Sequence, residues 1–135
     1  MTTDIEKKAE AYLFGTYSSP GISFEKSDEG KFDLWIVRGD SRSKGELKAS
    51  KGKFNSNADI AKNLIFNTKD EKVLFEKGET EIVRMFLGDN PPTVFIVNNK
   101  FISNGAKFER DHRYIIKGRR NYGTDAIANI SSSNK

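Results

Sequence analysis

The chain holds one histidine, His112, which is the only imidazole available as a general base or as a metal ligand. A metal site needs about three or four converging donors, and the sequence gives His112 no second histidine and no cysteine. A Ser-His-Asp triad would need Asp111 or a distant acid, together with a serine on a strained turn. No Gly-x-Ser-x-Gly segment is present. The sequence therefore assigns no catalytic residue and no metal site.

Carboxylates are the remaining candidates for acid–base chemistry, which a pair can perform if one member is buried. Glu79 and Glu81 share a face only if their strand begins early, and both adjoin a glycine turn, so we expect them to be solvated. Asp33 lies opposite the apolar stripe of its expected strand, on the same face as Trp35 and Val37. An enzyme is the less favoured interpretation, but a site made of carboxylates alone stays open at Asp33.

Neither of the glycine-rich phosphate-binding loops, Gly-x-x-x-x-Gly-Lys and Gly-x-Gly-x-x-Gly, occurs in the chain. The absence of cysteine excludes a disulfide scaffold and a cysteine nucleophile. We therefore expect no cofactor.

Positive charge gathers in residues 107–120, whose six basic and two acidic side chains carry the net charge of the whole chain, +4. On an unbroken strand Phe108 and Arg110 share a face, and an aromatic, cationic face suits single-stranded nucleic acid. An acidic protein partner suits the same charge. A solvated strand edge is the simpler interpretation. This basic surface comprises Lys107, Arg110, Arg113, Lys117, Arg119 and Arg120, and a second basic cluster comprises Arg42, Lys44, Lys48, Lys51 and Lys53.

The composition is that of one folded domain. A chain of 135 residues can bury a core, and its ten Phe, four Tyr and one Trp favour strands. No apolar run reaches the roughly 18 residues of a membrane span, so we expect a soluble chain. The N-terminus as written lacks an apolar signal core, which indicates a cytoplasmic protein; a signal peptide already removed would make it secreted or periplasmic.

The elements that must position these residues begin with a short helix. Apolar residues recur at helical spacing after the Thr3–Glu6 capping box, which predicts a helix over about residues 4–13. Residues 38–44 are expected to form a polar loop, and residues 54–66 fit either a helix or a strand. Alternating patterns predict strands at residues 22–25, 31–37, 46–50, 72–76, 81–87, 93–97 and 114–116.

Closely spaced strands without helices between them are typical of an antiparallel meander. The sequence therefore predicts a mainly β fold, in which the N-terminal helix leads into a small barrel or half-barrel. The alternative is an α+β fold with an open antiparallel sheet. We expect a single β-rich domain over residues 1–122 and a flexible C-terminal tail over residues 123–135.

The segment Tyr12-Leu13-Phe14-Gly15-Thr16-Tyr17 resembles the start of the calycin-type barrels, the lipocalins and fatty-acid-binding proteins. In that family a short helix leads into a Gly-x-Trp at the first strand, and in many lipocalins a late-strand Arg packs on the Trp ring. Tyr17 stands where the family has Trp, and Arg113 or Arg110 is the candidate arginine. The resemblance covers this motif and the overall plan of the chain.

The resemblance implies a closed up-and-down barrel around an apolar cavity. It predicts a non-enzymatic binding protein for a small apolar or amphipathic ligand. Tyr17 and Arg113 would close one end of the barrel, and the candidate lining residues are Asp33, Trp35, Phe75, Met85, Phe86 and Phe95. The alternative function is a protein- or nucleic-acid-binding module that acts through the basic surface.

Overall fold

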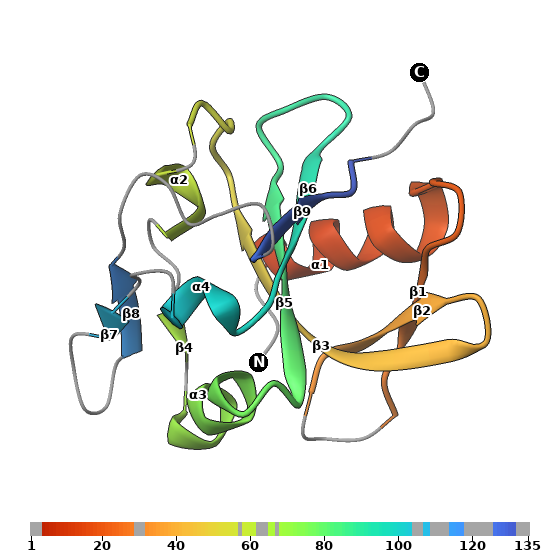
Figure 1. The fold of residues 1–135 in the computed structure, drawn as a ribbon. Helices are drawn as coiled ribbons and strands as arrows, with labels where there is room; N and C mark the ends of the chain where they lie inside the picture. Colours follow the sequence, from red (N-terminus) through yellow and green to blue (C-terminus); the bar gives the residue numbers. More distant parts are fainter. Residues whose placement is uncertain are drawn as a thin grey trace.

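A six-stranded sheet crosses the middle of the molecule, with one helix on its first face and short helices with a small second sheet on the other (Figure 1). The computed structural model describes residues 4–28, 32–56, 58–61, 65–66, 68–103, 107–108, 114–117 and 126–131. The strand order in the main sheet is β1-β2-β3-β5-β6-β9. These strands are β1 (Ser23–Lys26), β2 (Leu34–Arg38), β3 (Ser41–Ser50), β5 (Thr80–Phe86), β6 (Thr93–Val97) and β9 (Ile127–Asn129).

All neighbouring strands of this sheet are antiparallel except β3 and β5, which are parallel. Parallel strands need a long crossover connection. The chain between them supplies it with α2 (Ala58–Ala61), β4 (Ile65–Phe66) and α3 (Lys69–Glu76). Residues 54–66, which fit either a helix or a strand, therefore contain one of each.

The strand predicted over residues 72–76 is wrong, because these residues belong to α3. Thr68 begins the helix: its side-chain oxygen accepts a hydrogen bond from the Glu71 N–H at 3.2 Å, which is the bond of a helix N-cap. The loop predicted over residues 38–44 is also too long. β3 begins at Ser41, and Gly39, with φ of 59°, makes the tight turn after β2.

The mainly β fold with an N-terminal helix is confirmed, and it takes the open form of the alternative prediction. In the part of the chain that the structure describes, the main sheet does not close into a barrel, since β1 and β9 lie at its two opposite edges. The expected antiparallel meander is corrected at β3 and β5. The helices in their connection let two strands run in the same direction.

Side chains alternate between the two faces of the sheet, so the fold has a core on each side. The first core packs against α1 (Asp4–Ala11) and the π-helical turn Tyr12–Thr16, and the second packs beneath α2, α3 and α4 (Lys100–Ser103). The first contains Ala9, Leu13, Phe24, Leu34, Ile36, Leu47, Val83, Met85, Val94 and Ile96. The second contains Ile60, Phe66, Phe75, Ile82, Phe86, Phe95, Val97, Phe101 and Ala126.

The chain just after the N-terminal helix contacts the residue that follows β9. The helix predicted over residues 4–13 matches α1 and the turn after it, whereas Thr3 of the capping box lies outside the described residues. The Tyr17 hydroxyl donates to the Ile130 carbonyl. Residues 126–131, expected in a flexible tail, differ from that prediction, because β9 pairs with β6 and Ala126 is buried. A three-residue strand leaves too short a pattern to detect.

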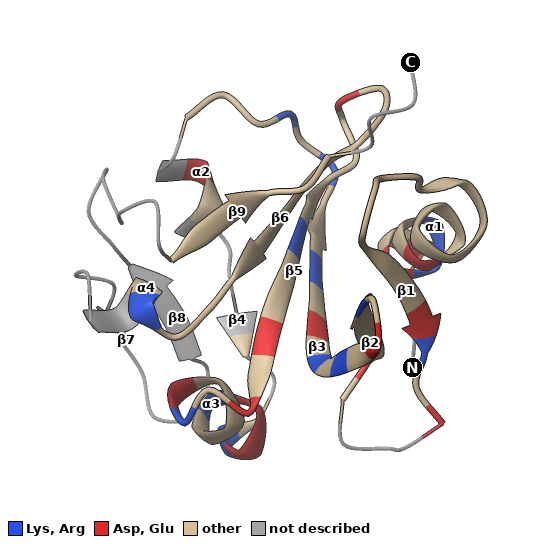
Figure 2. Ribbon diagram, turned by 45° about the vertical axis from the view of Figure 1, so that its right-hand side comes forward, with Lys and Arg blue, Asp and Glu red and all other residues tan. Residues whose placement is uncertain are grey.

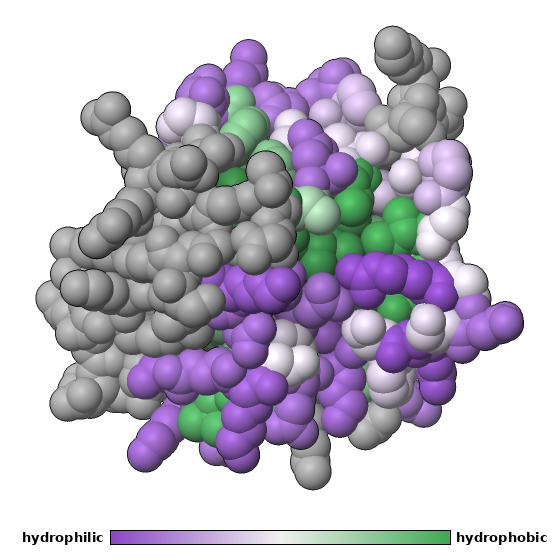
Figure 3. Space-filling view, viewed as in Figure 1, coloured by the Kyte–Doolittle hydropathy of each residue, from purple (hydrophilic) through white to green (hydrophobic). Residues whose placement is uncertain are grey.

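Charge is distributed unevenly over these elements. Figure 2 shows charged residues along β3 and on α3, whereas β6 and β9 carry none. On the face seen in Figure 3, hydrophilic side chains predominate around α3 and the β2–β3 hairpin, and hydrophobic ones reach the surface near the centre.

A small antiparallel sheet of β4, β7 (Lys107–Phe108) and β8 (Tyr114–Lys117) accompanies the second core. β8 confirms the strand predicted over residues 114–116. Within the described segments, no helix has both the length and the apolar character needed to cross a membrane.

Candidate functional site

The sheet register brings Asp33 and Glu46 together as a carboxyl pair. Leu34 lies opposite Gly45, so Asp33, which directly precedes β2, lies opposite Glu46. The Asp33 N–H donates to the Gly45 carbonyl at 3.0 Å, and Asp33 Oδ2 accepts from the Leu47 N–H at 2.8 Å. These two bonds hold the Asp33 carboxyl group against β3.

Burial separates the roles of the two carboxyl groups. Asp33 is exposed, whereas Glu46 is only 3% exposed. Burial raises the pKa of Glu46 to about 9, with further contributions from the charge of Asp33, a hydrogen bond to Asp33 and the charge of Glu71; Lys48 opposes the shift. At neutral pH the pair therefore keeps a proton on Glu46, because two ionised carboxylates facing each other would be strongly unfavourable.

Helix α3 faces the carboxyl pair and is tied to β3 by an ion pair. Lys48 Nζ lies 3.0 Å from Glu71 Oε1, and the two side chains are only 12% and 18% exposed. The same ammonium lies 5.5 Å from the centroid of the Phe66 ring. The positive charge of Lys48 is therefore balanced by Glu71 and does not neutralise the carboxyl pair.

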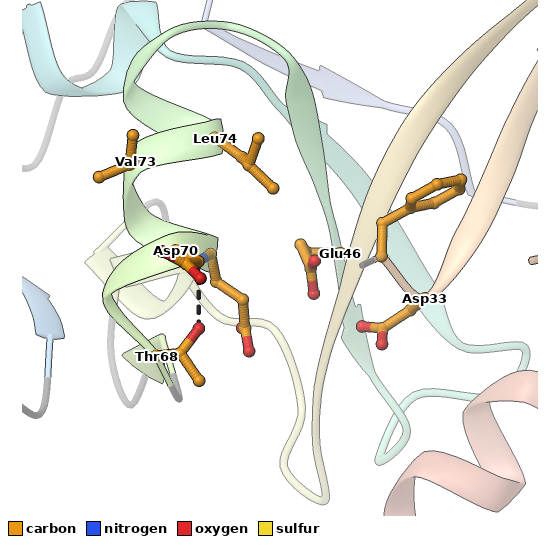
Figure 4. A pocket seen from close by; sticks show the side chains of 8 residues that line it. Asp33, Glu46, Thr68, Asp70, Val73 and Leu74 are labelled. Carbon is orange, nitrogen blue, oxygen red and sulfur yellow. Dashed lines mark hydrogen bonds between the residues drawn. The ribbon is translucent and has the colours of Figure 1, made fainter. Parts of the chain in front are cut away.

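A cavity of about 520 Å³, here called the Glu46 cavity, lies between α3 and the strands β2 and β3. Figure 4 shows the carboxyl groups of Asp33 and Glu46 directed toward the space beside α3, from which Val73 and Leu74 extend. Its volume is within the range of roughly 300–1,000 Å³ found for small-molecule sites. The cavity is lined by Phe32, Asp33, Glu46, Thr68, Asp70, Glu71, Val73 and Leu74.

The carboxyl pair can supply one O–H donor and several acceptor oxygens to a bound molecule. Ammonium and guanidinium groups have only donors, so they match the acceptors. A neutral acid beside a carboxylate is also the composition of acid–base catalysts. In the described segments, no group of three or more His, Asp or Glu side chains is arranged to hold a metal ion.

Of the predicted site residues, Asp33 lines the Glu46 cavity and Trp35 lies one row away on the same face. The half-buried Trp35 ring packs edge-on against Phe32, with centroids 4.6 Å apart. The Arg42 guanidinium carbon lies 4.3 Å from the Trp35 ring centroid. Trp35 and Asp33 thus line different cavities, and Lys44 lines the same cavity as Trp35.

The other predicted lining residues are buried in the two cores and do not line a common cavity. Adjacent residues of β5 point to opposite faces; Met85 therefore belongs to the first core, beside α1, while Phe86 belongs to the second. Phe75 and Phe95 pack with Phe86 in the second core. An open sheet puts these side chains in two separate cores, whereas a closed barrel would have turned one face inward.

Tyr17 follows the π-helical turn and precedes β1, rather than lying in a strand. Its ring packs edge-on against Tyr12 and Phe24, with centroid separations of 6.1 and 5.1 Å. Its predicted partner, Arg113, lies outside the described residues. Tyr17 is therefore part of the first core rather than of the Glu46 cavity.

Most of the basic surface lies outside the described residues: Arg110, Arg113, Arg119 and Arg120, with His112 among them. Only the backbone of Lys107 and Lys117 is described, and these residues lie opposite each other where β7 pairs with β8. Partner binding through this surface stays a prediction.

Sequence reasoning also missed a second buried ionisable residue, Arg84, which is 2% exposed. Its Nε donates to the Ile60 carbonyl at 3.0 Å and its Nη1 to the Lys48 carbonyl at 3.2 Å, so it ties α2 to β3. Burial lowers the pKa of Arg84 to about 10, against the opposing charge of Asp59, which leaves it charged at neutral pH. The sequence signal that could have identified Arg84 is its position within the otherwise apolar stretch of residues 82–86 in β5.

No family model, curated protein or solved structure matches this chain. The resemblance to calycins is therefore supported by no comparison and stays a prediction from one motif.

Proposed function

We propose that the chain is a non-enzymatic binding protein for a small amphipathic molecule with a cationic end, and that the Glu46 cavity holds this molecule. One observation carries the proposal: a carboxyl group that is only 3% exposed lies beside a second carboxyl group at a cavity that also has apolar walls. Burial raises the pKa of this group to about 9. Buried acids are rare unless they are paired, and this one borders a cavity large enough for a small ligand.

The charges around the cavity favour a cation. Asp33, Asp70 and Glu71 line it along with Glu46, while no lysine or arginine is among its described lining residues. Lys48 lies close by but is bound to Glu71. An ammonium group placed between the carboxyl pair and Asp70 would form charge-assisted hydrogen bonds, which are about twice as strong as neutral ones.

The remaining walls favour an apolar body on the same ligand. Phe32 is 6% exposed, and Val73 and Leu74 are half-buried lining residues of α3. Leu74 extends from the helix toward the strands (Figure 4). An alkyl or aryl group between Phe32 and these aliphatic side chains would lose contact with water, at about 25 cal/mol per Å² of apolar surface. We therefore propose an amphipathic ligand, which is one of the two classes, apolar or amphipathic, that the calycin resemblance implies.

Binding of a cation should depend on pH through Glu46. A bound positive charge favours the ionised form of Glu46, so binding below pH 9 releases a proton. Affinity for a permanently protonated amine should therefore rise with pH up to about 9 and level off above it, where Glu46 becomes ionised in the free protein as well.

The test compares three molecules with the same alkyl chain: hexylamine, hexanol and hexanoate. Each is titrated into the ¹⁵N-labelled full chain at pH 7.5, and the backbone amide shifts are followed by NMR. We expect hexylamine to bind at least about tenfold more tightly than hexanol, the worth of hydrogen bonds to a charged group, and hexanoate most weakly. The shifts should centre on Asp33, Glu46 and residues 68–74.

Two variants check that the site is the Glu46 cavity. Asp33→Asn should reduce hexylamine affinity, whereas Asp40→Asn removes the same charge at the exposed β2–β3 turn and should leave it unchanged. Equal loss in both variants, or shifts remote from the cavity, would show that hexylamine binds by general attraction and would contradict the proposal. Equal binding of hexanol and hexylamine would contradict the cationic end and would favour the apolar ligand, which is one of the two classes that the calycin resemblance implies.

A further inference from the structure

A second cavity, of about 500 Å³, lies on the same sheet face and has a different chemistry. Its described lining holds three cations, two carboxylates, two amides, two hydroxyls and one aromatic ring. We call it the Trp35 cavity; its lining residues are Trp35, Arg42, Ser43, Lys44, Gly78, Glu79, Thr80, Glu81, Asn98, Asn99 and Lys100.

One row of the sheet register forms the centre of this cavity. Trp35 lies opposite Lys44, and Lys44 lies opposite Thr80 on the other side of β3. Because Ile82 lies opposite Val97, the same row continues from Thr80 to Asn99, just after β6. These four residues thus occupy one row of the sheet, beside the row of the carboxyl pair on the same face. Lys44 Nζ lies 5.6 Å from the Phe32 ring centroid, and the Asn99 side-chain amide donates to the Glu76 carbonyl at 3.0 Å.

Thr80 is the unusual member of this row. It is 1% exposed, and its hydroxyl has no hydrogen-bond partner among the described residues. A buried hydroxyl that forms no hydrogen bond destabilises a fold, so a threonine here has no evident structural advantage over valine. A hydroxyl directed at a ligand would explain its presence.

The charged residues around the row are arranged to favour an anion. The Arg42 guanidinium carbon lies 4.3 Å from the Trp35 ring centroid, and Lys44 lies at the centre of the row. Arg42 Nη1 also lies 3.6 Å from Glu25 Oε1, in an ion pair whose two side chains are more than half exposed and therefore weakly bound. Of the two carboxylates, Glu81 is bound by Arg38 at 3.1 Å. A guanidinium placed over a ring face can still direct N–H groups, which lie in its own plane, toward the oxygens of a phosphate or carboxylate.

We propose that the Trp35 cavity binds an oxyanion, the phosphate or carboxylate group of a small molecule, through Lys44, Arg42 and the Thr80 hydroxyl. This site is separate from the Glu46 cavity, and the proposal does not rest on the function proposed for that cavity. The two are distinguishable because their predicted ligands have opposite charges.

Trp35 is the only tryptophan of the chain, so its fluorescence reports on this cavity directly. The full chain is titrated with inorganic phosphate and, separately, with acetate, at constant ionic strength. We expect a saturable change in Trp35 emission for at least one anion, with a dissociation constant on the order of 1 mM for so small a probe. The stronger of the two probes identifies the class of oxyanion.

Lys44→Ala should weaken this binding about tenfold or more. Lys51→Ala removes the same charge from an exposed position outside the lining and should leave it within about twofold. Equal losses in the two variants, or no saturable change with either anion up to 50-fold above the expected constant (~50 mM), would overturn the proposal. If Lys44→Ala does not fold, as judged by circular dichroism, Lys44→Gln takes its place.

Thr80→Val separates a binding hydroxyl from a structural one. We expect the variant to melt at the same or a higher temperature than the parent, because an unpartnered buried hydroxyl is removed. It should bind phosphate or acetate about fivefold more weakly. A lower melting temperature with unchanged anion affinity would show that the hydroxyl serves the fold, and would remove Thr80 from the site.

Discussion

Glu46 is the residue on which this interpretation depends most. Its side chain is almost completely buried, lies opposite Asp33 and borders a cavity. In an ordinary sheet that position would hold an apolar residue, as Ile82 does in the same row of β5. Retaining a carboxyl group there costs stability at neutral pH, which is typical of functional positions.

Glu46→Gln should change how stability depends on pH. The folded chain holds the Glu46 proton up to about pH 9, whereas the unfolded chain loses it near 4.5. The parent therefore keeps the full contribution of this group below pH 4.5 and loses stability as pH rises toward 9, by up to about 1.4 kcal/mol per unit. Chemical denaturation between pH 4 and 9 measures it.

The glutamine variant should lack this decline and become the more stable protein at pH 8. Glu79→Gln, at an exposed position, is the matched control and should follow the parent. Parallel pH profiles for the parent and Glu46→Gln would mean that Glu46 is ionised in the folded protein.

Sequence reasoning found half of this pair. Asp33 was identifiable because it interrupts an apolar stretch on the face opposite the stripe. Glu46 was not, because in the strand predicted over residues 46–50 it alternates with the apolar Leu47 and Ala49, and this pattern puts Glu46 on the outer face. In the structure α3 packs over that face. It does so because it belongs to the connection between the parallel strands β3 and β5, which an alternating sequence pattern cannot predict.

At the scale of elements, the decisive feature is the connection from β3 to β5. It places α3 over the sheet and so creates the Glu46 cavity. The sequence contained its start signal, Thr68 followed three residues later by Glu71, which is the pattern of a capping box. The alternation over residues 72–76 favoured a strand because Val73 and Phe75 also fit a period of two.

Most strands of the main sheet were predictable because long apolar alternation is a local signal. β5 and β6 lie within one residue of their predicted bounds. Sheet order and direction were not predictable, since they follow from contacts between distant segments. The parallel pairing of β3 with β5 and the pairing of β9 with β6 both depend on such distant contacts.

The parallel pair ends at a close backbone contact that tests the crossover geometry. Gly88 N–H donates to the Gly52 carbonyl at 2.9 Å, and a Cβ on Gly88 would lie 2.6 Å from the Gly52 carbonyl carbon. Gly88→Ala should therefore destabilise the protein by about 1–3 kcal/mol, measured by urea denaturation.

Gly52→Ala is the matched control, because a Cβ there meets nothing within 4 Å. It should change stability by no more than about 0.5 kcal/mol. Similar effects of the two substitutions would contradict the close approach of β3 and β5 at this end of the sheet.

At the scale of the whole molecule, one sheet face carries two cavities of opposite chemical character in adjacent rows. Phe32 lines the Glu46 cavity and Trp35 the Trp35 cavity, and their rings are in contact. Lys44 Nζ lies 5.6 Å from the Phe32 ring centroid. A ligand in one cavity therefore touches side chains that border the other, although each site is proposed on its own observations.

The net charge of the chain gives no indication of this arrangement. Residues 107–120 carry a charge equal to the total of +4, so the remainder is balanced overall. Within that balanced remainder the fold places four carboxyl groups and no lysine or arginine in the described lining of the Glu46 cavity, and three cations with two carboxylates in that of the Trp35 cavity. Composition alone therefore directed attention to the basic surface and away from the sheet face.

The ¹³C resonance of the Glu46 carboxyl carbon at pH 7.5, recorded with and without saturating hexylamine, tests the central claim most directly. The free protein should show the shift of a neutral acid, because Glu46 keeps its proton until about pH 9. Bound hexylamine should move the resonance to the position of an ionised carboxylate. A resonance that stays in place as hexylamine saturates the protein would contradict a cation site at the Glu46 cavity.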